Sequence, residues 1–159
     1  MTGPSEARPP RRITEVGVAV RSMEAATELL VDLLGAEPGP VMEVPAYDMR
    51  FRMCRIGKVD FEIMEPTSDR GVIAEFLAKR GEGLHHIAFA VDDIAGTVST
   101  LRAKGVAFVD EAPMRNRLTV TDFAGRVFSD EIQFTFSHPR SILGILFEFI
   151  QYPDGFATP

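Results

Sequence analysis

Three glutamates and one histidine interrupt apolar, strand-like segments of the sequence, and their side chains are of the types that bind metal ions. These residues are Glu15, Glu62, His86 and Glu148. A carboxylate on a mostly buried strand is costly unless it is paired or metal-bound, and one cation shared by all four residues offsets that cost. Three oxygens and one nitrogen suit Co²⁺, Mn²⁺ or Mg²⁺, and Zn²⁺, Ni²⁺ and Fe²⁺ also accept such ligands. We therefore predict a site for one divalent metal ion.

The four residues occupy matching positions in two halves of the chain. ITEVGVAV (residues 13–20) has the same hydrophobic pattern as LHHIAFAV (residues 84–91). In this alignment Glu15 matches His86. FEIM (residues 61–64) matches FEFI (residues 147–150), and in this alignment Glu62 matches Glu148. Two matched units indicate a duplication, whereas a solenoid needs three or more repeats. A duplicated unit would bring one ligand pair from each half to a shared centre.

Hydrophobic periodicity predicts an α+β fold made of two tandem βαβββ modules. Module one spans residues 13–66, and its first strand places Glu15 on the face opposite three alternating valines. A helix is expected between an N-cap at Ser22 and a C-cap at Gly35. Three further strand-like segments complete this module.

The pattern restarts in module two, residues 84–152, after a connector helix within residues 67–83. The segments LHHIAFAV, VAFVDEAP, QFTFSHP and ILFEFIQY are expected to be its strands, and a helix opens at Asp92-Asp93. Residues 114–132 have no evident counterpart in module one, so we interpret them as an insertion that covers one end of a site. Residues 1–12 are expected to be a disordered tail, and residues 153–159 an irregular one.

Composition excludes several classes of protein. The chain has 159 residues, a net charge of −6 and a calculated pI of about 5.1, so it lacks the basic character of a nucleic-acid-binding domain. The single cysteine, Cys54, rules out an internal disulfide framework and suits a reducing compartment. The sequence contains no membrane-spanning apolar run and no signal-peptide core. These features predict a cytoplasmic protein that acts on a small molecule and contacts neither membrane nor nucleic acid.

Three motifs carry a family resemblance: GEGLHHIAFAVDDI, VDFEIMEP and SHPRSILGILFEF. The chain resembles the vicinal-oxygen-chelate superfamily, also called the glyoxalase and bleomycin-resistance fold, and within it the methylmalonyl-CoA epimerases. The resemblance implies two βαβββ modules in a cupped, mostly antiparallel sheet around one metal ion, commonly in a homodimer. It also implies that the metal ligands are Glu15, Glu62, His86 and Glu148, the residues that the repeat selects.

The sequence departs from the epimerase pattern at two positions. Glu15 stands where the epimerases usually have a histidine ligand. The epimerase segment VPEQGV reads VPAYDM here, so Ala46 replaces a glutamate that is one of the two acid/base groups. Glu148 matches the second of these groups. Asp48, expected on the same strand face as Ala46, is a candidate replacement, with a plain surface residue as the alternative.

Four residues are candidates for substrate binding: His138, Arg140, Arg115 and Arg117. The histidine belongs to the segment SHPRS, where the resemblance implies a contact with substrate or with Glu148, and a turn-stabilising role is the alternative. The arginines have the charge to bind the phosphates of a coenzyme A, and solvated side chains are the alternative.

These features leave three hypotheses for function. The first is a metal-dependent epimerase or isomerase that acts through a stabilised enolate on an acyl-CoA or another small enolisable acid. The second is a glyoxalase-type lyase or another metal enzyme with a single base. The third is a non-catalytic, small-molecule-binding protein of the resistance type.

Overall fold

The computed structural model describes residues 7–10 and 12–159. Most of the predicted N-terminal tail, residues 1–6 and 11, lies outside this part of the chain. The contacts divide the chain into two compact units, of which unit 2 is Glu15–His86. Unit 1 contains Ile87–Pro159 and the described residues up to Thr14.

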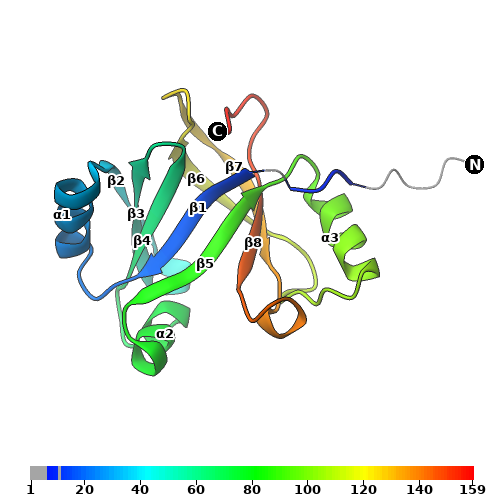
Figure 1. The fold of residues 1–159 in the computed structure, drawn as a ribbon, viewed down its shortest axis with the longest axis horizontal. Coiled ribbons are helices and arrows are strands. Elements are labelled where there is room, and N and C mark those ends of the chain that lie inside the picture. The colour runs from blue at the N-terminus through cyan, green and yellow to red at the C-terminus, as the bar shows by residue number, and fades with distance from the viewer. Residues whose placement is uncertain (1–6, 11) are drawn as a thin grey trace, which may run out of the picture. The chain divides into compact units, whose positions relative to one another are not determined.

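Unit 2 contains a sheet in which neighbouring strands follow the order β2-β3-β4-β1 (Figure 1). In chain order, its elements are β1 (Arg12–Ala19), α1 (Met23–Leu34), β2 (Glu37–Val44), β3 (Met49–Ile56), β4 (Val59–Pro66) and α2 (Val72–Arg80). Strand β1 runs parallel to β4, and β3 is antiparallel to both β2 and β4. The candidate ligands of the first half therefore lie on adjacent parallel strands.

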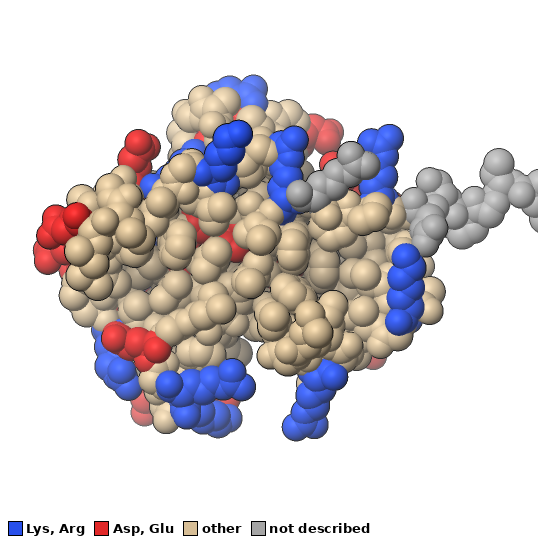
Figure 2. All heavy atoms as spheres, viewed as in Figure 1, with Lys and Arg blue, Asp and Glu red and all other residues tan. Residues whose placement is uncertain are grey.

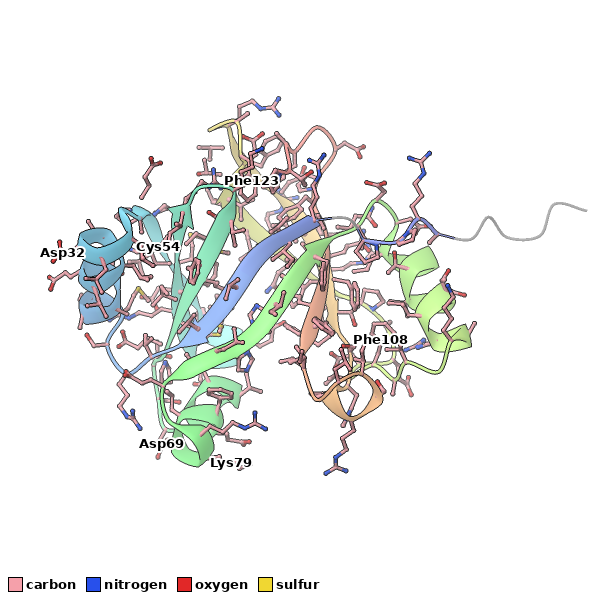
Figure 3. All side chains as sticks on the ribbon, viewed as in Figure 1. Asp32, Cys54, Asp69, Lys79, Phe108 and Phe123 are labelled. Atoms are coloured by element: carbon pink, nitrogen blue, oxygen red, sulfur yellow. The ribbon has the colours of Figure 1, made fainter. Side chains whose placement is uncertain are left out.

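Helix α1 covers one face of this sheet and leaves the other face to the candidate site. Val20, Cys54 and Ile63 pack into a buried cluster with Met23, the first residue of this helix, and Figure 3 labels Cys54 beside α1. Ser22 Oγ accepts a hydrogen bond from the Ala25 amide at the helix N-terminus, as expected of an N-cap. The left-handed conformation predicted for a glycine C-cap is also present, since Gly35 has φ 63°.

The strands of the second half repeat this design, with neighbouring strands in the order β5-β8-β7-β6, and all of them lie in unit 1 except the first half of β5, which ends with His86 in unit 2. The elements of this half are β5 (Gly83–Ala90), α3 (Ile94–Ala103), β6 (Met114–Thr121), β7 (Val127–Phe136) and β8 (Phe147–Gln151). Strand β5 runs parallel to β8, and β7 is antiparallel to both β8 and β6.

The two faces of the unit 1 sheet bury different clusters. Helix α3 packs Ile94 and Val98 against Phe149, with Phe108 at the edge of the cluster (Figure 3). The other face buries Ala88 and Ile150 with their neighbours. Asp93 caps α3 through its contact with the Gly96 amide, in agreement with the predicted helix start.

Residues 114–132 differ from their expected role as an insertion. They form β6 and the first part of β7, a hairpin with continuous register from Met114↔Phe134 to Thr121↔Val127. The segment VAFVDEAP, which we expected to be a strand, contributes only an isolated bridge between Phe108 and Ser137. We propose that the β6–β7 hairpin is the counterpart of β2–β3, so that residues 114–132 are part of the βαβββ pattern of module two and not an insertion into it.

The expected fold class is confirmed: each half contributes four strands, with a helix after the first of them, and so has the βαβββ pattern of the glyoxalase-like α+β fold. None of the helices in the described part of the chain is long and apolar enough to cross a membrane. Acidic and basic side chains are interspersed on the face shown in Figure 2.

Candidate metal centre

The side chains of His86 and Glu62 meet on the face of the unit 2 sheet that α1 leaves uncovered. His86 Nε2 lies 3.3 Å from Glu62 Oε2, and the two side chains are 2% and 12% exposed. Burial lowers the pKa of His86, and the nearby Glu62 carboxylate only partly opposes this shift. The imidazole is therefore neutral at pH 7 and carries a lone pair that a cation can accept.

A glycine makes room for this imidazole. Gly17 is the Cα partner of Glu62 in the parallel ladder between β1 and β4. A Cβ at this position would clash with Cε1 and Nδ1 of the His86 ring, so the ring would have to shift. The ring therefore lies directly over the backbone of β1, and its position depends on the absence of a side chain there.

Gly17→Ala is expected to displace the imidazole and to weaken the binding of a divalent cation by about 10–100-fold, the usual range for disturbed ligand geometry. Isothermal titration with Mn²⁺ measures the effect. In a His86→Gly background the same substitution should change little, since the clash partner is gone. Equal affinities of wild type and Gly17→Ala would show that the ring position does not matter.

His85 contacts the other side of the same imidazole. Its Nδ1 lies 3.0 Å from His86 Nδ1, although successive side chains of a strand ordinarily point to opposite faces. Burial, the neighbouring His86 and Arg80 lower the pKa of His85 to about 4. Two neutral imidazoles can form one hydrogen bond between their Nδ1 atoms, in which one ring donates and the other accepts. The other nitrogen of His86, Nε2, faces Glu62.

Glu15 lies on the same sheet face as Glu62, because it is two residues before Gly17, the β1 partner of Glu62. It is 7% exposed, and its Cα partner in β4 is Asp60, itself 6% exposed. Asp60 accepts two hydrogen bonds of 2.8 Å from Arg55 Nε and Nη2. The repeat gave no indication of this ion pair, because neither Arg55 nor Asp60 belongs to the repeated pattern.

Glu148 occupies the corresponding place in unit 1. It is the Cα partner of Ala88, two residues after His86 in β5, just as Glu62 is the partner of Gly17, two residues after Glu15 in β1. The predicted repeat is thus present in the register of both parallel strand pairs. Glu148 is 7% exposed, and burial raises its pKa to about 8.

In the metal-free protein, the free energy of unfolding is expected to fall as the pH rises from about 5 to about 8. The folded state keeps a proton on Glu148 up to about pH 8, whereas the unfolded carboxyl releases it near pH 4.5. The stability that is present below about pH 4.5 is therefore lost as the pH rises through about 8, by up to about 5 kcal/mol. Urea denaturation at several pH values measures this slope, and Glu148→Gln should flatten it. An unchanged slope in the variant would assign it to another group.

The chemistry of these donors fits a divalent cation. Glu15, Glu62 and His86 supply carboxylate oxygens and a neutral imidazole on one buried face of unit 2. Buried carboxylates that carry net negative charge are stabilised by a cation, and this mixture of ligands suits the harder first-row metals and Mg²⁺.

The structure does not place Asp48 as predicted. Pro45–Tyr47 form a 3₁₀ turn, and Asp48 ends the turn in the left-handed conformation with φ 51°. Ala46 and Asp48 therefore do not share a strand face, since neither belongs to a strand. The strand argument for Asp48 as a replacement base is wrong, because Pro45 starts a turn where we expected an extended chain.

Two of the predicted substrate-binding arginines lie on the wrong side of the unit 1 sheet for contact with Glu148. The register pairs Arg115 with Gln133 and Arg117 with Glu131, on the face opposite the one that carries Glu148. Both side chains are exposed, and Arg115 Nη1 lies 3.1 Å from Glu131 Oε1. This arrangement favours the alternative that they are surface residues.

His138 and Arg140 form a turn at the start of the segment that leads to β8. His138 Nδ1 accepts a hydrogen bond from the Arg140 amide at 3.2 Å and so caps the short 3₁₀ turn Pro139–Ser141. This contact favours the turn-stabilising role for the histidine. The Arg140 side chain is exposed.

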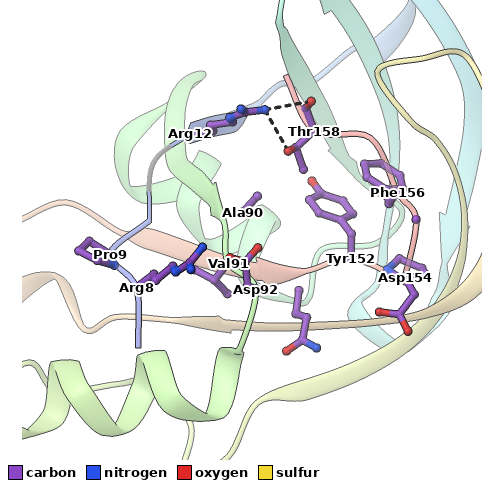
Figure 4. Close-up of a pocket in the computed structure, with 13 residues that line it drawn as sticks. Arg8, Pro9, Arg12, Ala90, Val91, Asp92, Tyr152, Asp154, Phe156 and Thr158 are labelled. Carbon is purple, nitrogen blue, oxygen red and sulfur yellow. Dashed lines mark hydrogen bonds between the residues drawn. The ribbon is translucent and has the colours of Figure 1, made fainter. Parts of the chain in front are cut away.

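Unit 1 also contains a pocket of about 500 Å³ between the described N-terminal and C-terminal segments (Figure 4). Its lining includes Arg8, Arg12, Asp92 and Tyr152, and Arg12 Nη1 donates to the Thr158 carbonyl at 3.2 Å. None of the candidate ligands lines this pocket.

Residues 14–124 match the model of the glyoxalase/bleomycin resistance protein/dioxygenase superfamily. The chain belongs to this superfamily. Among its relatives, the mitochondrial methylmalonyl-CoA epimerase of Mus musculus is 28% identical over 142 residues, which cover 88% of this chain and 72% of that protein. The ethylmalonyl-CoA/methylmalonyl-CoA epimerase of Cereibacter sphaeroides is 30% identical over 95 residues, 59% of this chain and 71% of that protein.

A solved structure of this superfamily agrees with the fold. A variant of the Streptomyces coelicolor methylmalonyl-CoA epimerase in complex with 2-nitronate-propionyl-CoA superposes with a TM-score of 0.75 at 26% identity. The match covers 90% of this chain and 98% of that one. The resemblance that the sequence motifs suggested is thereby confirmed at the level of family and fold.

Proposed function

We propose that this member of the glyoxalase superfamily is a metal-dependent epimerase or isomerase that acts on an acyl-CoA or another small enolisable acid. The observation that carries the proposal is the buried contact between His86 and Glu62, above a glycine that admits the ring. The epimerases among its relatives act, by their names, on methylmalonyl-CoA and ethylmalonyl-CoA. An acyl thioester is therefore the first substrate to test.

In this proposal Glu15, Glu62, His86 and Glu148 hold one divalent cation. Strand β5 carries His86, and Glu148 of β8 is the Cα partner of Ala88, two residues later in the same strand. When bound, the cation stabilises the negative charge that develops on the substrate's carbonyl oxygen. The identity of the metal is part of the test, with Co²⁺, Mn²⁺, Mg²⁺, Zn²⁺, Ni²⁺ and Fe²⁺ as candidates.

The chain's own residues supply the proton transfer. Burial keeps the pKa of Glu148 near 8 without a cation, so its carboxyl group exchanges protons in the range where a general base is effective. Glu148 takes the proton from the carbon next to the thioester. The return of a proton to the opposite face of this carbon requires a second acid/base group. Ala46, which replaces the glutamate of the epimerase pattern, has no side chain that can carry a proton. Asp48 is the carboxylate nearest to it in sequence and stays a candidate on that ground alone.

The test is incubation of the purified protein with methylmalonyl-CoA in D₂O, with and without each metal. Metal-dependent incorporation of deuterium at the α-carbon is the expected result. Incorporation without inversion would indicate an enzyme with a single base, and Asp48→Asn should then leave the rate unchanged. A protein that holds no stoichiometric metal and exchanges no proton would favour the binding-protein hypothesis instead.

The homodimer and the cytoplasmic location expected from the sequence stay predictions. Light scattering of the purified protein tests the homodimer, and fractionation of cells tests the cytoplasmic location.

A further inference from the structure

We propose that His85 is a positioning residue for the metal centre: its Nδ1 accepts a hydrogen bond from His86 Nδ1, so that the lone pair of His86 lies on Nε2. This inference rests on the proposed function, in which His86 binds a divalent cation, and it adds one residue outside the donor set. It concerns only residues of unit 2.

The contact between the two imidazoles has the geometry of a hydrogen bond. His85 Nδ1 lies 3.0 Å from His86 Nδ1, and the rings meet edge-on at an interplanar angle of 86°. One nitrogen of such a pair donates and the other accepts, and a protonated imidazole has no nitrogen that accepts. At least one ring is therefore neutral, and the contact allows two directions of donation.

The direction of donation decides whether His86 can bind a cation. If His86 accepted at Nδ1, its proton would lie on Nε2, which faces Glu62 Oε2 at 3.3 Å. A protonated Nε2 has no lone pair for a metal ion. If His86 donates from Nδ1, the lone pair lies on Nε2, on the side of the Glu62 carboxylate. Histidine ligands of metals ordinarily donate from their other nitrogen in this way, which fixes both the tautomer and the ring orientation.

Helix α2 holds the half-buried His85 ring in place. Phe76 contacts this ring edge-on, with the two centroids 5.0 Å apart and an interplanar angle of 69°. Arg80, one helical turn later, has its Cζ 5.8 Å from the centroid of the Phe76 ring, within the distance of a cation–π contact. The helix itself is anchored by two buried side chains, Ile73 and Leu77. The acceptor nitrogen is thus held at a defined place.

A short link explains why a helix outside the two modules reaches this histidine. Helix α2 ends at Arg80, and β5 begins at Gly83 (Figure 1). The Gly81 amide donates to a carbonyl of the last helical turn, and a φ of 76° at this glycine turns the chain towards the strand. The ring contacts of His85 are therefore made by the segment that leads directly into its own strand.

Two substitutions separate the hydrogen bond from the packing of His85. Asparagine and leucine have the same branched shape, and both remove the ring that contacts Phe76. Only asparagine carries an acceptor, the amide oxygen, at the branch position that Nδ1 occupies in histidine. A difference in metal affinity between His85→Leu and His85→Asn therefore reports the acceptor alone.

The experiment is calorimetric titration of the full chain with Mn²⁺ alone, alongside thermal unfolding of each variant without metal. His85→Leu is expected to weaken Mn²⁺ binding by about 10–100-fold, the usual effect of losing the hydrogen bond that orients a ligand. His85→Asn should recover most of this loss.

His138 of unit 1 provides a matched control, because its Nδ1 is also an acceptor. It accepts from the Arg140 amide at 3.2 Å and lies outside the donor set. His138→Leu and His138→Asn exchange the same groups there. Neither should change the Mn²⁺ affinity, even if His138→Leu lowers the unfolding temperature.

Nitrogen-15 spectra of the wild-type protein loaded with Zn²⁺ or Mg²⁺ test the direction of donation. These diamagnetic ions leave the imidazole signals visible, and the signals report which nitrogen of each ring carries the proton. We expect the proton of His86 on Nδ1 and that of His85 on Nε2. A proton on Nδ1 of His85 in the loaded protein would overturn the inference.

Equal Mn²⁺ affinities of His85→Leu and His85→Asn would also overturn it, whether both variants bind as wild type or both bind weakly. A wild-type protein that binds none of the candidate metals would instead overturn the proposed function. The wild-type titration therefore distinguishes the two failures.

Discussion

His86→Ala is expected to reduce the affinity for Mn²⁺ by at least about 100-fold, the largest effect of any single substitution on metal binding. The imidazole is the only nitrogen donor proposed, it is 2% exposed, and its Nε2 faces Glu62 at 3.3 Å. Its removal leaves the Glu62 carboxylate on a buried face without that neighbour. Calorimetric titration and metal analysis of the purified variant measure the loss.

A second histidine provides the control for this measurement. His138→Ala removes an imidazole from the cap of the 3₁₀ turn in unit 1, where His138 Nδ1 accepts from the Arg140 amide. This change should lower stability by about 1 kcal/mol, the cost of a lost cap, and leave metal affinity intact. If both variants lost metal equally, or if His86→Ala lost none, the proposed ligand set would be wrong.

Glu148→Gln is expected to slow α-proton exchange by about 10²–10⁴-fold, the usual contribution of a general base. Glutamine keeps the shape of the side chain and an oxygen that can face a cation, but it cannot accept the substrate's proton. Burial raises the pKa of Glu148 to about 8, which suits it to this role. The rate of deuterium incorporation from D₂O is the measurement, with metal content determined on the same sample.

Glu131→Gln is the matched control for the base. Glu131 lies on β7, on the sheet face opposite to Glu148, and pairs with Arg115 at 3.1 Å. Exchange at the wild-type rate is expected of this variant. Wild-type exchange in Glu148→Gln itself, at full metal occupancy, would assign the base to another residue.

Local sequence chemistry predicted the parts of the fold that depend on neighbours along the chain. Ser22 and Asp93 cap α1 and α3 as expected, since a side-chain oxygen at an N-cap needs only the amide two or three residues later. The matching positions of the candidate ligands within their strands were also predictable. Glu15 and His86 are each the fourth residue of an eight-residue strand, because alternation of apolar residues reports the buried face directly.

Sequence reasoning failed where a different local rule competed with strand periodicity. The alternating exposed positions of β6 carry arginines and threonines, so MRNRLTVT resembled a polar insertion, although its pairing with β7 makes it a strand. At VPAYDM, proline and a left-handed Asp48 produced a turn in place of the extended strand that we expected.

The sequence by itself determined which residues can donate to a metal ion, which of them share a strand face, and which family the chain resembles. These properties depend on side-chain chemistry and on a period of two along the strand. The tertiary structure decided that Gly17 admits the His86 ring, that Asp60 holds Arg55, and that Arg115 faces away from Glu148. Each of these depends on the register between strands, which joins residues far apart in the chain and is set by the packing of the whole sheet.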